Sequence, residues 1–337
     1  MTYQITHFND PTDKLSDLKE LFARYPNKPY SYYRELPSDV LESYFQRVVE
    51  DHAARGELVV AASRDSHPRG VAFLLDLPWD TDIFGISMGR VVLICDSEPF
   101  ADAYDTACHL LASCLGLAER RNITHLVCQV SAREVPVHHA LEAEGFRLMD
   151  TITIHTRSLP ARLPHPTKAS AIVRSWEERD VEALCRLAAS AFGDREHNLN
   201  RLHSDPLLQG RADSMYEMWL KNSLTGEQAD LILVAEVEGA VGGFLTVKFP
   251  TALMQEVLPL KIASVPLNAV DAAYRGRGLY RLLVWAAFEA AHRHEHDYLE
   301  IKTQVTNLAV ERTWQSMGGT LQMSYHSFHR VVKSPGG

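Results

Sequence analysis

The residues best suited to chemistry lie in one short segment, 273–281, which reads Ala-Tyr-Arg-Gly-Arg-Gly-Leu-Tyr-Arg. Gly276 and Gly278 carry no Cβ atom, so a ligand could approach the backbone closely at both positions. Arg275, Arg277 and Arg281 add positive charge at the same point. Glycines and cations of this kind bind phosphate groups at the start of a helix, and the segment therefore predicts a diphosphate site.

The flanking residues predict the elements that position this turn. The segment 268–270 is typical of the end of a strand, and the residues after the turn are apolar at helical spacing. These apolar residues are Leu279, Leu282, Leu283, Ala286, Ala287 and Ala290. The first backbone N–H groups of a helix have no partner within it, and the helix dipole favours an anion there. A strand end and a helix N-terminus are thus expected to hold the diphosphate.

Other nucleotide-binding turns fit this segment less well. A nicotinamide-binding turn would need a third glycine and an acidic residue after the next strand. A nucleoside-triphosphate loop would need Gly-Lys followed by Ser or Thr. Neither pattern is present in the segment. An ordinary strand-to-helix turn with incidental arginines is the remaining alternative.

The order of elements resembles the GNAT acetyltransferase superfamily. The turn and its helix are followed by a strand at 298–303, a helix that begins near Asn307, and Gly318. In that family the turn binds the diphosphate of acetyl coenzyme A, through the motif Gln/Arg-x-x-Gly-x-Gly/Ala. Arg275-x-x-Gly278-x-Tyr280 matches it except at the last position. The resemblance implies an acyl donor, acetyl coenzyme A, and no metal.

Composition limits the classes of partner. With 337 residues, 46% of them hydrophobic and 23% charged, the chain is long enough for two globular domains. The net charge of −9 argues against nucleic acid or an anionic membrane as the main partner. No signal-peptide pattern or long apolar run is present, and the five cysteines have no metal or redox spacing, which predicts a cytoplasmic protein. The histidines of 292–296 are interpreted as part of a solvated helix C-terminus and not as metal ligands. Whether the protein forms a homodimer is left open.

The two halves of the chain resemble each other in their order of predicted elements. Three prolines in the segment 158–167 indicate a linker at 159–168 between domains 1–158 and 169–333. The segments 126–131 and 301–306 are similar, and a short helix and a glycine follow each. The prediction is an α/β (α+β) fold of tandem GNAT-like domains. Each has a mixed, mostly antiparallel twisted sheet flanked by helices, and the second has a splayed central strand pair.

Only the second half has the glycine turn. In the first half the strand at 91–97 runs into the acidic segment 101–105 with no glycine between them. An acidic turn without glycine is poorly suited to a diphosphate, so the N-terminal half is not expected to bind coenzyme A.

Further segments resemble one tandem family. The segment 77–85, Leu-Pro-Trp-Asp-Thr-Asp-Ile-Phe-Gly, is similar to the Trp-Asp-Ser-x-x-Phe-Gly signature of TDP-fucosamine acetyltransferase and its relatives, and 200–206 and 212–223 also resemble that group. The resemblance implies acetyl transfer to the amine of a nucleotide-linked amino sugar. A free amino sugar, an amino acid, an aminoglycoside-like compound or a peptide amine, a longer acyl group, and a non-catalytic coenzyme A-binding protein are the alternatives.

The resemblance also implies which residues contact the donor. A splayed strand, here 264–270, supplies backbone N–H groups to pantetheine and to the thioester carbonyl. Pro266 has no N–H, so Leu267, Asn268 and Ala269 are the predicted polarising donors. The full predicted donor-binding set is Leu267, Asn268, Ala269, Val270, Arg275, Gly276, Arg277, Gly278, Leu279, Tyr280, Arg281, Asn307 and Trp314.

The general acid departs from the family pattern. A tyrosine seven residues after the asparagine usually protonates the leaving thiolate, but after Asn307 that position is Trp314. The predicted catalytic residues are therefore Tyr280 first, with Asn307, Leu267 and Tyr325. Residues predicted to contact the acceptor substrate are Arg201, His203, Asp205 and Tyr216. His203, Asp205 and His329 are left open as the base, and direct transfer in a ternary complex is expected.

Overall fold

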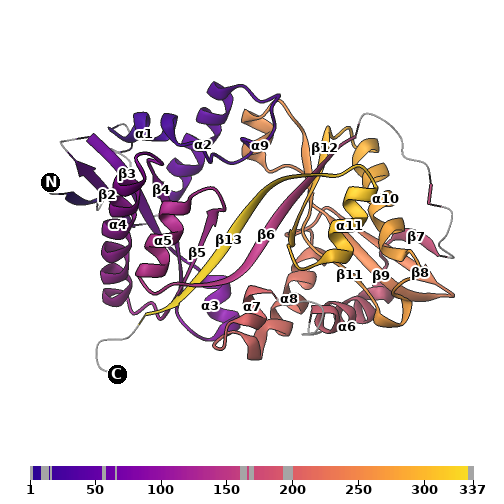
Figure 1. The fold of residues 1–337 in the computed structure, drawn as a ribbon. Coiled ribbons are helices and arrows are strands. Elements are labelled where there is room, and N and C mark those ends of the chain that lie inside the picture. The colour runs from indigo at the N-terminus through magenta and orange to yellow at the C-terminus, as the bar shows by residue number, and fades with distance from the viewer. Residues whose placement is uncertain are drawn as a thin grey trace. The chain divides into compact units, whose positions relative to one another are not determined.

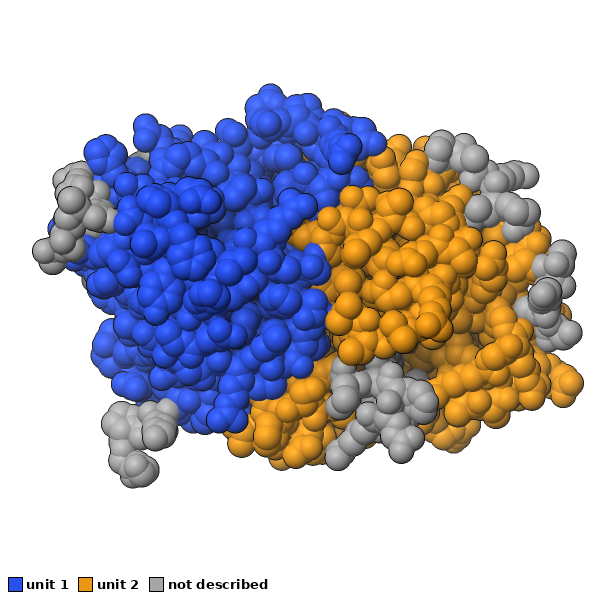
Figure 2. Space-filling model, viewed as in Figure 1, with its two compact units in different colours: residues 1–151, 324–337 blue, residues 152–323 orange. Residues whose placement is uncertain are grey.

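The computed structural model describes residues 3–8, 15, 17–54, 58–64, 67–159, 165–166, 171–192 and 200–332. The chain forms two compact units, Met1–Thr151 with Ser324–Gly337, and Ile152–Met323 (Figure 2). The predicted domains 1–158 and 169–333 differ from these units because the last strand is grouped with the first unit. Most of the predicted linker, 159–168, lies outside the described residues.

The first unit is built on one sheet with the strand order β1-β2-β3-β4-β5-β13 (Figure 1). The strands are β1 (Gln4–Phe8), β2 (Leu58–Arg64), β3 (His67–Asp76), β4 (Met88–Cys95), β5 (His125–Ser131) and part of β13 (Thr320–Val331). Neighbours are antiparallel except β4 and β5, which are parallel. The helices are α1 (Lys19–Arg24), α2 (Ser38–Ala54), α3 (Pro78–Phe84), α4 (Phe100–Arg120) and α5 (Val135–Ala143).

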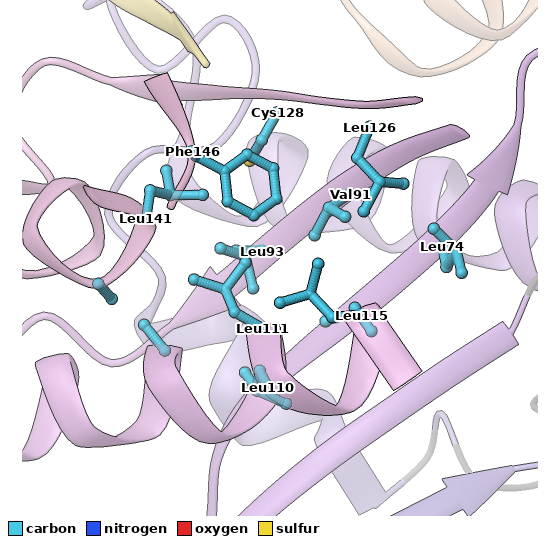
Figure 3. Close-up of a cluster of buried hydrophobic side chains, with 14 of the residues drawn as sticks. Leu74, Val91, Leu93, Leu110, Leu111, Leu115, Leu126, Cys128, Leu141 and Phe146 are labelled. Carbon is cyan, nitrogen blue, oxygen red and sulfur yellow. The ribbon is translucent and has the colours of Figure 1, made fainter. Parts of the chain in front are cut away.

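Strand β3 is buried on both faces of this sheet. Ala72 and Leu74 pack into a core with α4 and α5, part of which Figure 3 shows, whereas Val71 and Phe73 pack into a second core with α1 and α2. Successive side chains of a strand point to opposite faces, so a strand between two helical layers needs apolar residues at both sets of positions. This explains the continuous apolar run at 71–75.

The second unit has two groups of strands. Residues 152–158 of β6 (Arg147–Ser158) pair with β12 (Tyr298–Gln304), which pairs with β10 (Ile262–Val265). A separate sheet has the order β11-β9-β8-β7. Its strands are β7 (Ile172–Ser175), β8 (Leu231–Val237), β9 (Ala240–Val247) and β11 (Asn268–Val270). The helices are α6 (Val181–Phe192), α7 (Arg201–Ser204), α8 (Ala212–Leu224), α9 (Ala252–Val257), α10 (Leu279–Arg293) and α11 (Leu308–Ser316). The predicted mixed sheets flanked by helices are confirmed, and none of the described helices could span a bilayer.

The last strand of the chain completes the sheet of the first unit. Residues 325–331 of β13 pair antiparallel with β5, from Tyr325↔Ser131 to Val331↔His125. Phe328 is 2% exposed and belongs to the same core as α4 and α5. The unit boundaries fall inside β6 and β13, so each strand contributes residues to both units. The similarity of the two halves predicts the strands β6 and β13. It does not predict that β13 pairs with β5 and that β6 pairs with β12.

Replacement of Phe328 tests this assignment. Phe328→Ala is expected to lower the free energy of unfolding of the first unit by about 3–5 kcal/mol, because it empties a closely packed site. Denaturant unfolding together with amide hydrogen exchange along β5 measures the effect. Val331→Ala, on the same strand but 54% exposed, is the control and should change stability by less than about 0.5 kcal/mol. Loss of protection confined to the second unit would contradict the assignment.

Candidate functional site

The central strand of the second unit divides into two pieces that join different sheets. β10 pairs in parallel with β12, and the last pair is Val265↔Ile301. After Pro266 and Leu267 the chain continues as β11, which pairs antiparallel with β9. Residues 302–304 of β12 therefore have no β10 partner in the register. This divergence is the predicted splayed strand pair, and Pro266 stands where it begins, as the missing N–H of proline allows.

Hydrogen bonds show which backbone groups of residues 267–271 point towards β9 and which point away from it. The N–H of Leu267 donates to Thr246 Oγ1 at 2.9 Å, and the Leu267 carbonyl accepts from the Thr246 N–H at 2.8 Å. Asp271 donates its N–H to the carbonyl of Gly242 at 3.0 Å. Backbone groups of a strand alternate in direction, so residues 267, 269 and 271 face β9, and the N–H groups of Asn268 and Val270 point away from it.

This alternation bears on the predicted polarising donors. Asn268 and Val270 keep backbone donors that are directed away from β9, whereas the N–H of Leu267 is already bonded to Thr246. The alternation directs the Ala269 N–H to β9 in the same way. Which of these residues polarises a carbonyl stays a prediction. Sequence spacing alone does not show these directions, because the three residue steps from Ser264 to Leu267 lie opposite only two steps, from Lys248 to Thr246.

The predicted turn has the geometry of an anion cradle. Gly276 and Gly278 have φ values of +76° and +82°, a region that favours glycine, and α10 begins at the next residue. The Asp271 carboxylate accepts from the Ala273 N–H at 2.8 Å and fixes the preceding turn. A Cβ atom at Gly276 would meet nothing within 4 Å, so the space above the loop is open. The loop and helix start therefore fit a diphosphate group of a ligand such as coenzyme A.

Three arginines surround this loop, and all are exposed. The Arg277 guanidinium lies 5.3 Å from the ring centroid of Tyr274. Arg281 donates to Ser316 Oγ at 2.9 Å and so connects the first turn of α10 to the end of α11. In a chain with a net charge of −9, this local cluster with Arg275 provides attraction for an anion.

Two glycines of β9 that were not predicted as site residues lie very close to the start of α10 and to β11. A Cβ atom at Gly242 would lie 2.9 Å from Leu279 Cδ2, and one at Gly243 would lie 2.9 Å from the Ala269 carbonyl oxygen. Both residues lie in β9, so this strand admits the start of α10 and strand β11 at close range. The signal was a Gly-Gly pair inside an apolar strand pattern, which indicates close approach of another backbone.

Tyr280 and Trp314 form a hydrogen-bonded pair between α10 and α11. Trp314 is fully buried, packs edge-to-face on Phe288 at 5.2 Å, and donates from Nε1 to the Tyr280 hydroxyl at 3.2 Å. Burial raises the pKa of the Tyr280 phenol well above its ordinary value, and the Trp314 hydrogen bond opposes this only in part. In the described part of the chain, no acceptor takes the Tyr280 hydroxyl proton. Tyr280 is thus held as a neutral phenol with a proton to donate.

The other predicted catalytic residues have different surroundings. The Asn307 side chain accepts from the Val310 N–H at 3.4 Å, so it caps the start of α11. Tyr325 belongs to the first unit, where it pairs with Ser131 of β5. His329 also lies in the first unit, with its ring 5.0 Å from that of His125. Tyr280 and Asn307 therefore share the second unit with the loop, and Tyr325 and His329 do not.

The residues predicted to contact an acceptor lie on and near α7. Among them, His203 donates from Nε2 to the Asp213 carboxylate at 3.1 Å and stacks parallel to Tyr216, with 6.3 Å between the ring centroids. The Asp205 carboxylate accepts from the Leu207 N–H at 2.9 Å. His203, Asp205 and Tyr216 are all buried, whereas Arg201 is half-buried. These contacts fix the local fold around α7 and α8, and a contact with substrate stays a prediction.

The corresponding turn of the first unit has the opposite charge arrangement. Asp96 stands between β4 and α4 and is bound by Arg24 at 3.1 Å and by Arg69 at 3.3 Å. The described residues 96–99 include no glycine, so this turn has no cradle like that of 275–278. That the first half does not bind coenzyme A stays a prediction.

Comparison with known proteins gives the class of the second unit. Residues 197–318 match the model of the acetyltransferase (GNAT) family. The spore coat polysaccharide biosynthesis protein SpsD of Bacillus subtilis (strain 168) is 27% identical over 154 residues. This alignment covers 45% of the chain and 48% of SpsD, so the chain spans about half the length of this relative.

Solved structures show the same fold over nearly the whole chain. A GCN5-related N-acetyltransferase from Sphaerobacter thermophilus has a TM-score of 0.65 at 14% identity, and the match covers 98% of this chain and 96% of that one. A tandem GNAT protein from the clavulanic acid biosynthesis pathway has a TM-score of 0.53 at 13% identity, covering 98% and 99%. The segment 197–318 therefore matches the acetyltransferase (GNAT) family, and the chain has the fold of these solved structures, one of which is a tandem GNAT protein.

Gly276→Ala tests the cradle. A Cβ atom there fits the empty space but would occupy the position of a phosphate, so the dissociation constant of coenzyme A should rise at least about tenfold, or about 1.4 kcal/mol. Titration calorimetry measures this. Gly239→Ala is the matched control, because Gly239 has a φ of +83° and nothing within 4 Å of a Cβ but lies in the β8–β9 turn. Both variants should lose about 1–2 kcal/mol of stability from backbone strain; equal coenzyme A affinity in the two would contradict the assignment.

Proposed function

We propose that this chain is an N-acetyltransferase that moves an acetyl group directly from acetyl coenzyme A to the amine of a nucleotide-linked amino sugar. The observation that carries the proposal is the glycine and arginine loop at the start of α10, directly after the divergence of β11 from β12. A diphosphate on the loop leaves the rest of an extended donor free to run along β11. The family match of the same segment, 197–318, supports this donor.

Acyl transfer from a thioester needs a polarised carbonyl and a good leaving group. The backbone N–H groups of Asn268 and Val270 are directed away from β9 and suit pantetheine and the thioester carbonyl. No covalent acyl-enzyme is needed, because Cys185 lies on α6 and burial raises the pKa of its thiol, which disfavours a nucleophilic thiolate. The amine therefore attacks the donor directly.

Tyr280 is the proposed proton donor to the leaving sulfur. A tyrosine phenol is protonated at neutral pH, the form that a general acid needs, and the raised pKa of Tyr280 extends this form to higher pH. Trp314 Nε1 donates to the phenol oxygen and not to its proton, so it orients the hydroxyl and stabilises the phenolate that remains after transfer. The pair therefore takes over the role that the resemblance gives to a tyrosine at position 314.

The acceptor is inferred from a relative and from a segment of the first half. SpsD is named for polysaccharide biosynthesis, and the segment 77–85, in which Trp79 and Phe84 lie on α3, resembles the signature of nucleotide-amino-sugar acetyltransferases. A small sugar amine has a pKa near 8, like an α-amino group, so a substantial part is neutral near physiological pH. Such an amine can attack a thioester without a strong base.

Acetyl transfer across a panel of amines tests the function. The panel contains TDP- and UDP-linked amino sugars, with free amino sugars and polyamines for contrast, and thiol release reports turnover. Calorimetric titration of coenzyme A runs alongside. Turnover with a nucleotide sugar is expected. Turnover only on free amines would change the acceptor class, and absence of coenzyme A binding would overturn the proposal.

Tyr280→Phe tests the acid. The turnover number should fall about 100-fold, at the low end for general acids because a thiol leaves readily, while coenzyme A affinity stays unchanged. The raised pKa of Tyr280 also predicts that the wild-type turnover number does not fall from its ionisation up to about pH 10. A variant with wild-type turnover would remove Tyr280 from the mechanism. Trp314→Phe keeps an aromatic ring in the core but removes the N–H that orients Tyr280. The turnover number of this variant should therefore fall less than that of Tyr280→Phe.

A further inference from the structure

Three buried polar side chains connect α11 to strand β6. Thr153 and His155 are two residues apart on β6, so they lie on the same face of the sheet. Both contact Glu311 of α11: the Thr153 hydroxyl is hydrogen-bonded to Glu311 Oε1, and His155 Nε2 lies 2.5 Å from Glu311 Oε2. All three side chains are buried. We refer to Thr153, His155 and Glu311 as the polar row.

The polar row is an unusual way to join a helix to a sheet. Such an interface is normally apolar, because burial removes a carboxylate from water at a large cost in free energy. A buried ionic contact offsets this cost but adds little stability beyond that of apolar residues of the same size. Apolar contacts are non-directional, however, whereas polar contacts hold their partners in one geometry. The polar row is therefore suited to fixing the position of α11 on β6.

Helix α11 carries the residue that contacts the proposed proton donor. Trp314 follows Glu311 by three residues, so the two lie close together on one side of the helix. Trp314 is fully buried and donates from Nε1 to the Tyr280 hydroxyl at 3.2 Å. This distance is at the long end of the range for a hydrogen bond, so a small displacement of α11 breaks it. The position of α11 thus determines whether the Tyr280 phenol is oriented.

The first unit allows a comparison within the same chain. Arg157 of β6 donates to the Met317 carbonyl, directly after the end of α11. In the first unit, Arg330 of β13 donates in the same way to the Glu144 carbonyl, directly after the end of α5. The two units therefore share this contact between an arginine of the strand and the end of the helix, and the shared contact belongs to the fold.

The polar row is not shared between the two units. The residues that correspond, counted back from these arginines and carbonyls, are Thr153 and His326, His155 and Phe328, Glu311 and His138, and Trp314 and Leu141. None of the four counterparts in the first unit, all of which the structure describes, is a carboxylate. Phe328 and Leu141 belong to the apolar core there. The polar row and the tryptophan thus occur together in the unit that has the glycine and arginine loop.

We propose that the polar row positions the proton donor, because it holds α11 where Trp314 Nε1 meets the Tyr280 hydroxyl. The inference rests on the proposed acetyl transfer, in which Tyr280 protonates the leaving sulfur. The members of the polar row do not touch a substrate in this role. They act through α11 and Trp314, and without them the phenol remains in place but loses its fixed orientation.

An apolar version of the row tests this role. Thr153→Val, His155→Leu and Glu311→Leu are combined, so no side chain of the row keeps a polar group without its partner, and the midpoint of thermal unfolding should not fall. With the amine that the wild-type protein acetylates fastest, kcat should fall about tenfold, a part of the loss in Tyr280→Phe. KM for the amine and the dissociation constant of coenzyme A should stay within about twofold. Gln315→Leu, at an exposed position of α11, is the control and should keep kcat within about twofold.

A double-mutant cycle separates positioning from a general effect on the protein. If the polar row acts through the Tyr280 hydroxyl, its apolar version should change kcat by less than about twofold when Tyr280 is already replaced by Phe, because effects at coupled residues do not add. An equal loss of kcat with and without the Tyr280 hydroxyl would contradict the role. Wild-type kcat in the apolar version would contradict it as well.

The indole N–H of Trp314 gives a readout that does not require turnover. Its signal in a nitrogen–proton correlation spectrum is the one that Trp314→Phe removes. Tyr280→Phe should shift this signal upfield, because the N–H loses its acceptor, and the apolar version of the row should shift it in the same direction. Gln315→Leu should leave it unchanged. If the combined variant does not fold, Thr153→Val alone should shift the signal, and an unchanged signal in that variant overturns the role.

The outcomes distinguish this inference from the proposed function. If the wild-type protein acetylates an amine but neither kcat nor the Trp314 signal responds to the apolar version, the role of the polar row is wrong and the function stands. If the wild-type protein acetylates no amine but the Trp314 signal responds, the function is wrong, and the positioning of Trp314 against Tyr280 is supported.

Discussion

The divergence of one strand from its neighbour determines most of what the second unit can do. A sheet normally satisfies every backbone N–H with an adjacent strand, and an unpaired group in the interior is costly. Here the pairing with β12 ends at Val265 of β10, and the Asn268 and Val270 N–H groups of β11 point away from β9. The gap is stable only because β11 keeps β9 as its other partner. The close contact of Gly243 with the Ala269 carbonyl shows how tightly that partner is held.

The helix side of this gap combines two physical features. Positive φ angles, helix N–H groups and arginines at the start of α10 favour an anion. The low dielectric around Tyr280 and Trp314 keeps a phenol neutral.

The sequence predicted local features well and non-local ones poorly. The turn at 275–278 and its helix are confirmed because glycine, charge and helical spacing all act within a few residues. The splayed strand was predicted from Pro266 and the family resemblance. The side on which each N–H points was not, because one extra residue between Ser264, which pairs with Lys248, and Leu267, which pairs with Thr246, shifts the alternation. The partner of β13 was not predicted, because pairing between distant segments leaves no local pattern in the sequence.

The position of β13 in the first unit also affects how the protein is made. Gln129 of β5 and Ser327 of β13, whose side chains are 3.4 Å apart, are separated by 198 residues. A ribosome adds about 5–20 residues per second, so β5 waits roughly 10–40 s for its partner while the second unit is synthesised. During that time the N-terminal unit has an open strand edge, a surface that other chains can pair with. Co-translational assembly of this protein therefore cannot proceed one half at a time: the first half to leave the ribosome is the last to be completed.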